Sequence, residues 1–166
     1  MNAPPEQDTE DLFTPTLSED DDALDFDQPW NPQSLVFATF FGGFLTGGIL
    51  FGLNFKRLGR PERAWPCIVG GAILTLAWTY FAVDARQRGW YEGDSGLRSA
   101  VRIAQRALPV IVALWIAQLQ KRRFRVYEGA HGEGARALVP GFLAVLLSMV
   151  VTFGLAFSLQ LLLGDA

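Results

Sequence analysis

Four long apolar segments, separated by shorter polar stretches, dominate the hydrophobic pattern of this chain of 166 residues. The first, residues 34–55, runs for 22 positions without a charged side chain and is followed at once by Lys56 and Arg57. About 20 apolar residues, at a rise of 1.5 Å each, span the roughly 30 Å of hydrocarbon in a bilayer. The pattern therefore predicts a membrane protein whose first transmembrane helix covers about residues 34–55.

Two further segments are typical of transmembrane helices. Residues 64–83 carry Trp65 near one end and Trp78 and Tyr80 near the other, and aromatic rings of this kind favour the headgroup boundary. Residues 137–163 form a run of 27 residues. This run is longer than a bilayer requires, so we expect its helix to tilt or protrude.

The remaining segment, residues 97–120, is ambiguous because its uncharged core, residues 107–120, has only 14 residues. Basic side chains flank this core on both sides and can extend their charged ends to the headgroups, which makes a thin span workable. Pro109 lies near the start of the core and favours a kink. We predict a short third transmembrane helix here, with a re-entrant or interfacial helix as the alternative.

Residues 1–33 contain ten acidic residues, no basic residue and five of the nine prolines. Such a segment cannot bury enough apolar surface to offset the entropy of ordering it, so we predict a disordered acidic tail. It is either a docking segment that folds on binding or a soluble tail whose Trp30 sits at the membrane interface. The predicted fold class is thus all-α, with a four-helix transmembrane domain at residues 34–163 after the tail at residues 1–33.

The basic residues predict an orientation, because Lys and Arg accumulate on the cytoplasmic side of a membrane. Of the 14 basic residues, four lie in the first loop, five in the third loop and five around the second loop. Four crossings place the first and third loops on one side, nine basic residues against five, which predicts both termini outside. If the third segment does not cross, the count becomes ten against four and the orientation inverts.

Small residues recur at helical spacing in three of the segments, where they let helix backbones approach closely in lipid. They serve either packing within one bundle or oligomerisation through the first helix. The predicted helix-packing residues are Gly43, Gly47, Gly48, Gly52, Gly71, Ala144, Ser148 and Thr152.

A basic stripe at the start of the third helix consists of Arg98, Arg102 and Arg106, spaced four residues apart. Side chains at this spacing share one helix face. We predict that the stripe contacts anionic lipid headgroups or the acidic tail; an ordinary flank that reaches the interface is the alternative.

Side chains that carry chemistry are few. Cys67 is the single cysteine and His131 the single histidine, which excludes a disulfide within the chain and a site of several histidines. No Asp, Glu, Lys or His lies at the centre of a predicted span, which argues against a proton-coupled pump. We therefore expect no enzymatic activity, no cofactor and no metal.

Residues 38–65 resemble the opening of an uncharacterised family of small bacterial multi-pass membrane proteins. That family shows a glycine-paired first helix followed by Asn, a basic residue and Leu-Gly, and Phe44 stands where it often has proline. The resemblance covers roughly a sixth of the chain and implies a four-helix membrane fold and no activity. The matching residues are Gly42, Gly43, Gly47, Gly48, Asn54, Leu58 and Gly59.

Abundant packing residues and sparse chemistry lead to one functional expectation. We expect a bacterial inner-membrane protein that acts as a non-catalytic accessory or scaffold subunit through helix packing. A small oligomeric transporter or channel is the alternative, with a pore lined by Thr75 and Thr79 or by Ser148 and Thr152. Expected partners are the lipid bilayer and a membrane protein or further copies of this chain, and no nucleic acid.

Overall fold

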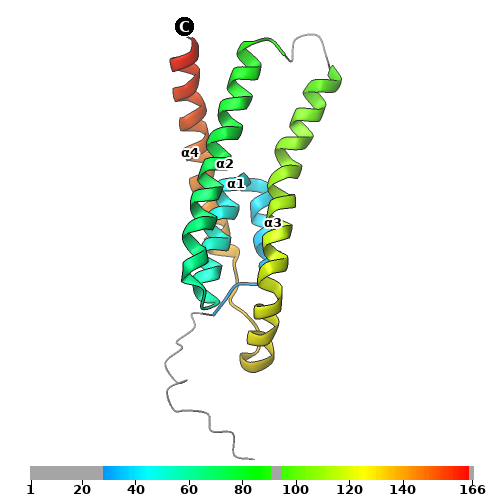
Figure 1. Cartoon of the computed structure of the whole chain (residues 1–166), viewed down its shortest axis with the longest axis vertical. Helices are drawn as coiled ribbons and strands as arrows, with labels where there is room; N and C mark the ends of the chain where they lie inside the picture. The colour runs from blue at the N-terminus through cyan, green and yellow to red at the C-terminus, as the bar shows by residue number, and fades with distance from the viewer. Residues whose placement is uncertain (1–27, 91–94, 165–166) are drawn as a thin grey trace, which may run out of the picture.

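The computed structural model describes residues 28–90 and 95–164, and the described chain is helical apart from short connections (Figure 1). Its elements are α1 (Pro32–Arg57), the short 3-10 helix η3 (Pro61–Arg63), α2 (Ala64–Gln87), α3 (Ser95–His131) and α4 (Leu138–Gly164). Four helices are long and apolar enough to cross a membrane. The predicted all-α class with four apolar helices is therefore confirmed, whereas residues 1–27 of the predicted tail lie outside the described residues.

α1 doubles back on itself at Gly43 (Figure 1). Gly43 has φ +74° and ψ −160°, which is far from helical geometry. A straight helix of 26 residues would hold its ends about 39 Å apart. Instead, the backbone N–H of Trp30, just before the helix, donates to Oδ1 of Asn54, near its end, at 2.8 Å. The segment predicted as one straight crossing is therefore a helical hairpin with two arms.

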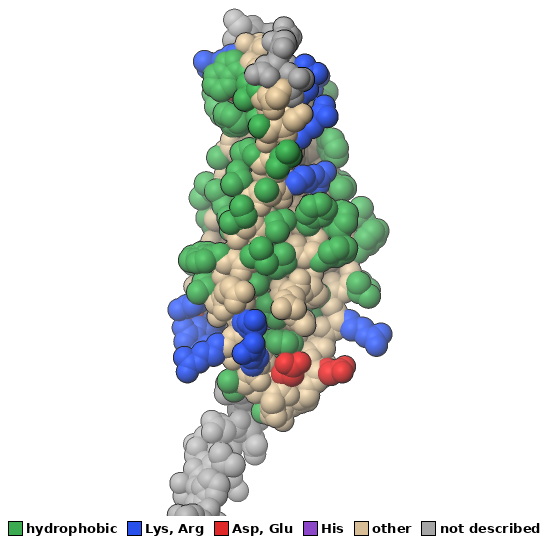
Figure 2. Space-filling view, turned by 90° about the vertical axis from the view of Figure 1, so that its right-hand side faces the viewer, with side chains coloured by type: hydrophobic (Ala, Val, Ile, Leu, Met, Phe, Trp, Pro, Cys, Tyr) green, Lys and Arg blue, Asp and Glu red, His purple; other side chains and the backbone are tan. Residues whose placement is uncertain are grey.

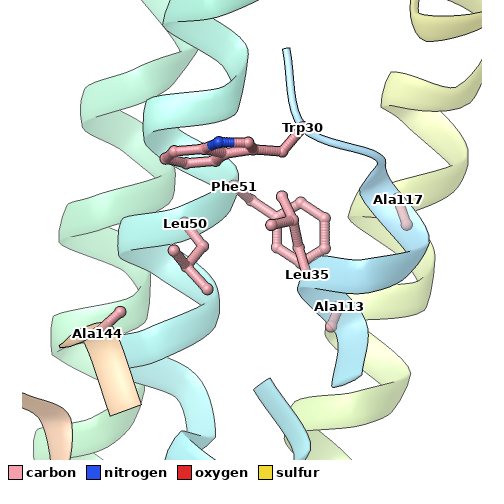
Figure 3. Packing of buried hydrophobic residues seen from close by; sticks show 7 residues of the cluster. All are labelled: Trp30, Leu35, Leu50, Phe51, Ala113, Ala117 and Ala144. Carbon is pink, nitrogen blue, oxygen red and sulfur yellow. The ribbon is translucent and has the colours of Figure 1, made fainter. Parts of the chain in front are cut away.

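The residues of the hairpin explain why it closes. A positive φ such as that of Gly43 is open to glycine but strained for other residues. An ideal Cβ on Gly47 in the second arm would lie 2.9 Å from Cγ2 of Thr39 in the first arm, so a bare glycine lets the arms approach. Leu35, Leu50 and Phe51 lie in one buried cluster from both arms, each at most 1% exposed (Figure 3).

α1 ends in a glycine turn that leads toward α2. Gly59 has φ +70°, the N–H of Arg60 donates to the Phe55 carbonyl at 2.8 Å, and the N–H of Gly59 donates to the Lys56 carbonyl at 3.1 Å. This pair of hydrogen bonds around a left-handed glycine is a common way to terminate a helix. Leu58, beside the glycine, is buried, so the Leu-Gly pair shapes the end of the hairpin.

The other helices are arranged around the α1 hairpin (Figure 1). α1 packs against α2, α3 and α4, and α2 also packs against α4. Within the described residues, by contrast, the backbones of α2 and α3 stay apart. The hairpin is therefore the central element of the bundle, and α3 is held to the described bundle through it.

α3 is one continuous helix that passes through Pro109. The alternative of a re-entrant third helix does not match this structure, in which the first helix turns back instead. α3 also continues to His131, whereas the sequence predicted an end near Gln120. The residues after Gln120 are mostly Lys, Arg and other good helix formers. The helix therefore continues beyond the end of its apolar stretch.

The hairpin returns the chain to the end of the bundle from which it started. The N–H of Ala135, between α3 and α4, donates to the Pro29 carbonyl at 3.0 Å. The last turn of α4 lies at the opposite end of the bundle (Figure 1). Residue 28 and the last turn of α4 therefore lie at opposite ends of the bundle. This differs from the arrangement expected of four straight helices, because hydropathy does not distinguish a straight helix from a hairpin of equal length.

The surface between the two ends of the bundle is mainly apolar (Figure 2). On the face shown, Lys and Arg side chains gather toward the two ends, and hydrophobic side chains cover most of the length between them. Phe153 of α4 is 75% exposed and Ile103 of α3 is 67% exposed. Large exposed apolar surfaces of this kind mark contact with a membrane or with other proteins.

Candidate functional site

A buried hydrogen-bond network joins the segment before α1 to the end of α1 and to α3. Oδ1 of Asn54 accepts from the Trp30 N–H at 2.8 Å, and Nδ2 of Asn54 donates to the Trp30 carbonyl at 3.1 Å and to Oε1 of Gln120 at 2.7 Å. Nε2 of Gln120 donates to the Phe51 carbonyl at 3.0 Å. Both amide side chains are fully buried. Buried polar groups are destabilising unless they are paired. The network therefore favours one relative position of these three segments.

The Trp30 side chain is buried by the same segments. Its ring is part of the hydrophobic cluster and is 4% exposed (Figure 3). The guanidinium carbon of Arg57 lies 4.1 Å from the ring centroid, which is a cation–π distance, and Nη1 of Arg57 donates to the Gln28 carbonyl at 2.9 Å. We call residues 28–30, with these contacts, the Trp30 anchor. The composition had assigned these residues to the disordered tail, but the structure holds them against the bundle.

The tip of the hairpin is capped by side chains from α3 and α4. The last carbonyls of the first arm have no partner within the helix, because the helix breaks there. Nη1 of Arg106 donates to the carbonyls of Phe40 and Phe41 at 3.3 Å and 3.4 Å, and Oγ of Ser148 donates to the Gly42 carbonyl at 2.6 Å. The positive guanidinium also suits the negative end of the arm's dipole.

Most of the predicted packing glycines lie where α1 meets α2. An ideal Cβ on Gly48 would lie 2.9 Å from Cα of Gly71, and one on Gly71 would lie 2.7 Å from the Phe44 carbonyl oxygen. A Cβ on Gly52 would meet the Ile68 side chain at 2.7 Å. These glycines therefore allow a close helix contact within the chain.

Gly43 differs from the other predicted packing residues. No heavy atom lies within 4 Å of an ideal Cβ at Gly43, so its role is to form the turn. On α4, Ala144 and Ser148 are buried, and the Ala144 carbonyl accepts from Oγ1 of Thr46 at 3.2 Å. Thr152 is half-buried farther along α4.

The predicted basic stripe divides in the structure. Arg106 bonds to the hairpin tip, while Arg98 and Arg102 are exposed on the same helix. Contact of the stripe with lipid or with the acidic tail stays a prediction.

Three of the four hydroxyls considered for a pore, those of Thr75, Thr79 and Ser148, donate to backbone carbonyls in the structure. Oγ1 of Thr75 donates to the Gly71 carbonyl and Oγ1 of Thr79 to the Thr75 carbonyl, at 2.8 Å and 2.7 Å, within their own helix. His131 stacks on Tyr127 with ring centroids 4.9 Å apart. Across residues 28–90 and 95–164, no group of three His, Cys, Asp or Glu side chains is placed to hold a metal ion.

Only part of the buried network could be recognised from the sequence. Asn54 stands out as a polar residue inside an apolar run, but Gln120 sits at the end of its run beside Lys121. Gln118, two positions earlier, is exposed, so composition does not show which glutamine points inward. The pairing joins residues 66 positions apart, and no local pattern reveals it. Comparison of the chain with protein families, curated proteins and solved structures gives no match.

Proposed function

We propose that this protein is a non-catalytic integral membrane protein that presents its acidic N-terminal segment to a partner, as an accessory or scaffold subunit of a membrane assembly. The observation that carries the proposal is the Trp30 anchor. Residues 1–27 contain ten acidic residues and no basic residue, and residues 28–30, directly after them, are held against the bundle. The anchor therefore holds the attachment point of the acidic segment at a defined place on the bundle, which supports a role in presenting that segment to a partner.

The buried polar side chains support a structural role over a chemical one. Catalytic acids, bases and nucleophiles have to reach a substrate. In the described bundle, each buried hydroxyl or amide side chain is hydrogen-bonded to the protein itself. These residues are Thr39, Thr46, Asn54, Thr75, Thr79, Gln120 and Ser148.

The proposed topology has α2, α3 and α4 crossing the membrane and α1 entering and leaving on one side. The end of the bundle with the Trp30 anchor carries nine basic residues, against five toward the other end. The positive-inside rule then places the anchor and the acidic segment in the cytoplasm and the end of α4 outside. This orientation replaces the one expected from four crossings, because the hairpin moves the start of the chain to the other side. We propose the bacterial inner membrane as the location.

Mass spectrometry of the intact assembly tests the proposed role. A C-terminally tagged chain is extracted gently from its native membrane at neutral pH and low salt. We expect a second protein in stoichiometric amount, which is lost when residues 1–27 are deleted and the anchor is kept. A matched variant with the ten acidic residues changed to Asn or Gln separates charge from length. A lone monomer or a homo-oligomer would refute the accessory role.

A small transporter is the second candidate, and the broken helix is the observation that favours it. Half-helices whose ends meet inside the bilayer form substrate sites in several transporter folds. Here the tip is capped by Arg106 and Ser148, so transport would require these contacts to open. Solute flux in proteoliposomes that is lost in Ser148→Ala, with folding unchanged, would favour this candidate; absence of flux with a range of ions and small solutes would count against it.

A further inference from the structure

An apolar cleft lies between α2 and α3, and the second arm of α1 forms most of its floor. It exists because α2 and α3 pack against the hairpin and their backbones stay apart. The cleft has a volume of about 340 Å³. Gly47, Gly48 and Phe51 belong to the floor, and Cys67 and Gly70 to the α2 wall.

The length of the cleft matches one leaflet of a bilayer. Along η3 and α2 its lining runs from Arg63 to Leu74, and along α3 it runs from Pro109 to Leu119. At 1.5 Å per residue these stretches are about 17 Å and about 15 Å long. The hydrocarbon core of a bilayer is roughly 30 Å thick, so the cleft reaches from one membrane surface to near the midplane.

Charge is placed at only one end of this cleft. Arg63, which is exposed, is the one charged side chain in the lining, and it lies at the end of the bundle where α2 begins. Arg60, on the connection before it, is paired with Glu62 at 3.8 Å, so Arg63 itself supplies the positive charge at this end. A guanidinium forms strong, directional hydrogen bonds to phosphate oxygens. An apolar channel with a basic mouth therefore complements an anionic phospholipid.

We propose that the cleft binds one anionic phospholipid of the leaflet on the Trp30-anchor side, with its phosphate on Arg63 and an acyl chain along the glycine-rich floor. A transmembrane helix is a poorer fit, because an apolar helix has no phosphate to pair with the guanidinium at the mouth of the cleft. The inference depends on the membrane location proposed above but not on the accessory role.

Gly70 offers a way to fill the cleft without disturbing the bundle. It lines the cleft, and no heavy atom lies within 4 Å of an ideal Cβ at this position. Gly70→Leu places a side chain in the space where the lipid would lie. Gly154→Leu is the matched control, because Gly154 on α4 is also free of contacts within 4 Å but lies away from the cleft.

The first test is native mass spectrometry of the detergent-purified full chain, incubated with phosphatidylglycerol or phosphatidylcholine. We expect the wild type and Gly154→Leu to retain one phosphatidylglycerol and at least fivefold less phosphatidylcholine. Gly70→Leu should lose the retained lipid by tenfold or more. Arg63→Gln should keep a lipid but bind the two lipids about equally, whereas Arg122→Gln, at the same end of the bundle, should keep the preference. Retention by Gly70→Leu as in the wild type, or an equal affinity of the wild type for both lipids, would overturn the proposal.

The single cysteine provides a second test on the wild-type protein alone. Cys67 is half-buried in the cleft wall, so a bound acyl chain should shield its thiol. We expect phosphatidylglycerol to slow alkylation of Cys67 by N-ethylmaleimide several-fold, and phosphatidylcholine to slow it much less. An alkylation rate that neither lipid changes, or protection that appears only with a second polypeptide present, would show that the cleft is not a lipid site. This result would leave the accessory role untouched.

Discussion

Asn54 binds both backbone hydrogen-bonding groups of Trp30, accepting from its N–H at 2.8 Å and donating to its carbonyl at 3.1 Å. A neighbouring β-strand pairs with an extended residue through its N–H and its carbonyl. Here a single amide side chain makes both of these hydrogen bonds. The same side chain reaches Gln120 on α3. Asn54, at the end of the hairpin, is therefore hydrogen-bonded both to Trp30 before α1 and to α3.

Replacing Asn54 with leucine should destabilise the bundle and release the anchor. Asn54→Leu leaves the N–H and carbonyl of Trp30 and Oε1 of Gln120 without the Asn54 partner in a buried site, at about 1–3 kcal/mol for each unsatisfied group. Thermal unfolding followed by circular dichroism in detergent should show a lower Tm, and limited proteolysis should cut faster before α1. Gln118→Leu is the control, because Gln118 is exposed on α3. Equal Tm values for the two variants would contradict the proposed role of the network.

Gly43→Ala should be destabilising even though the added methyl group has room. No heavy atom lies within 4 Å of its ideal Cβ, but φ is +74°, and an alanine held in such a conformation costs about 1–3 kcal/mol. We expect a lower unfolding temperature for this variant. Gly154→Ala adds the same methyl group in an ordinary helical position and should be neutral or slightly stabilising. A hairpin that tolerates Gly43→Ala as well as Gly154→Ala would show that the turn does not need glycine.

Two adjacent glycines of α2 should respond in opposite ways to the same change. A Cβ on Gly71 would lie 2.7 Å from the Phe44 carbonyl oxygen, whereas one on Gly70 meets nothing within 4 Å. Gly71→Ala should therefore push α2 from α1 and cost about 1–3 kcal/mol, as overpacking does. Gly70→Ala should gain up to about 1 kcal/mol from helix propensity. Chemical unfolding of the two variants in one detergent measures the difference, and similar shifts for both would argue against a glycine-mediated α1–α2 contact.

Reporter fusions distinguish three crossings from four. If α1 returns to its own side, a tag before residue 28 and a tag inserted at Gly132 report the same compartment, and a tag after the end of α4 reports the opposite one. Four crossings would separate the first two tags and place the tags at the two ends together. Fusions to green fluorescent protein and to alkaline phosphatase give this result directly, since each is active on one side of the inner membrane only. A split between the first two tags would reject the hairpin topology.

The four helices were predictable because composition alone makes residues near 34–55, 64–83, 97–120 and 137–163 apolar enough to span a bilayer. The hairpin was not predictable, because a straight segment and a folded segment have the same hydropathy. Gly43 is also one of several glycines in this segment, so nothing marks it as the turn. The glycine pairs did predict close packing, and Gly48 lies against Gly71. The sequence did not predict that the contact is to α2, since spacing on one helix does not identify its partner. The extent of α3 was underestimated because its polar end is helical without being apolar.

The hairpin also has a consequence for the order in which the protein can be assembled as it is synthesised. Trp30 precedes Asn54, so two of the three Asn54 hydrogen bonds can form as soon as α1 leaves the ribosome. Gln120 follows 66 residues later, which is about 3–13 s at a synthesis rate of 5–20 residues per second. During that interval one N–H of Asn54 lacks its partner, while α2 is already being synthesised. Once Gln120 has been synthesised, the third Asn54 hydrogen bond can form and join α3 to the hairpin. The hairpin can therefore fold before α3 exists.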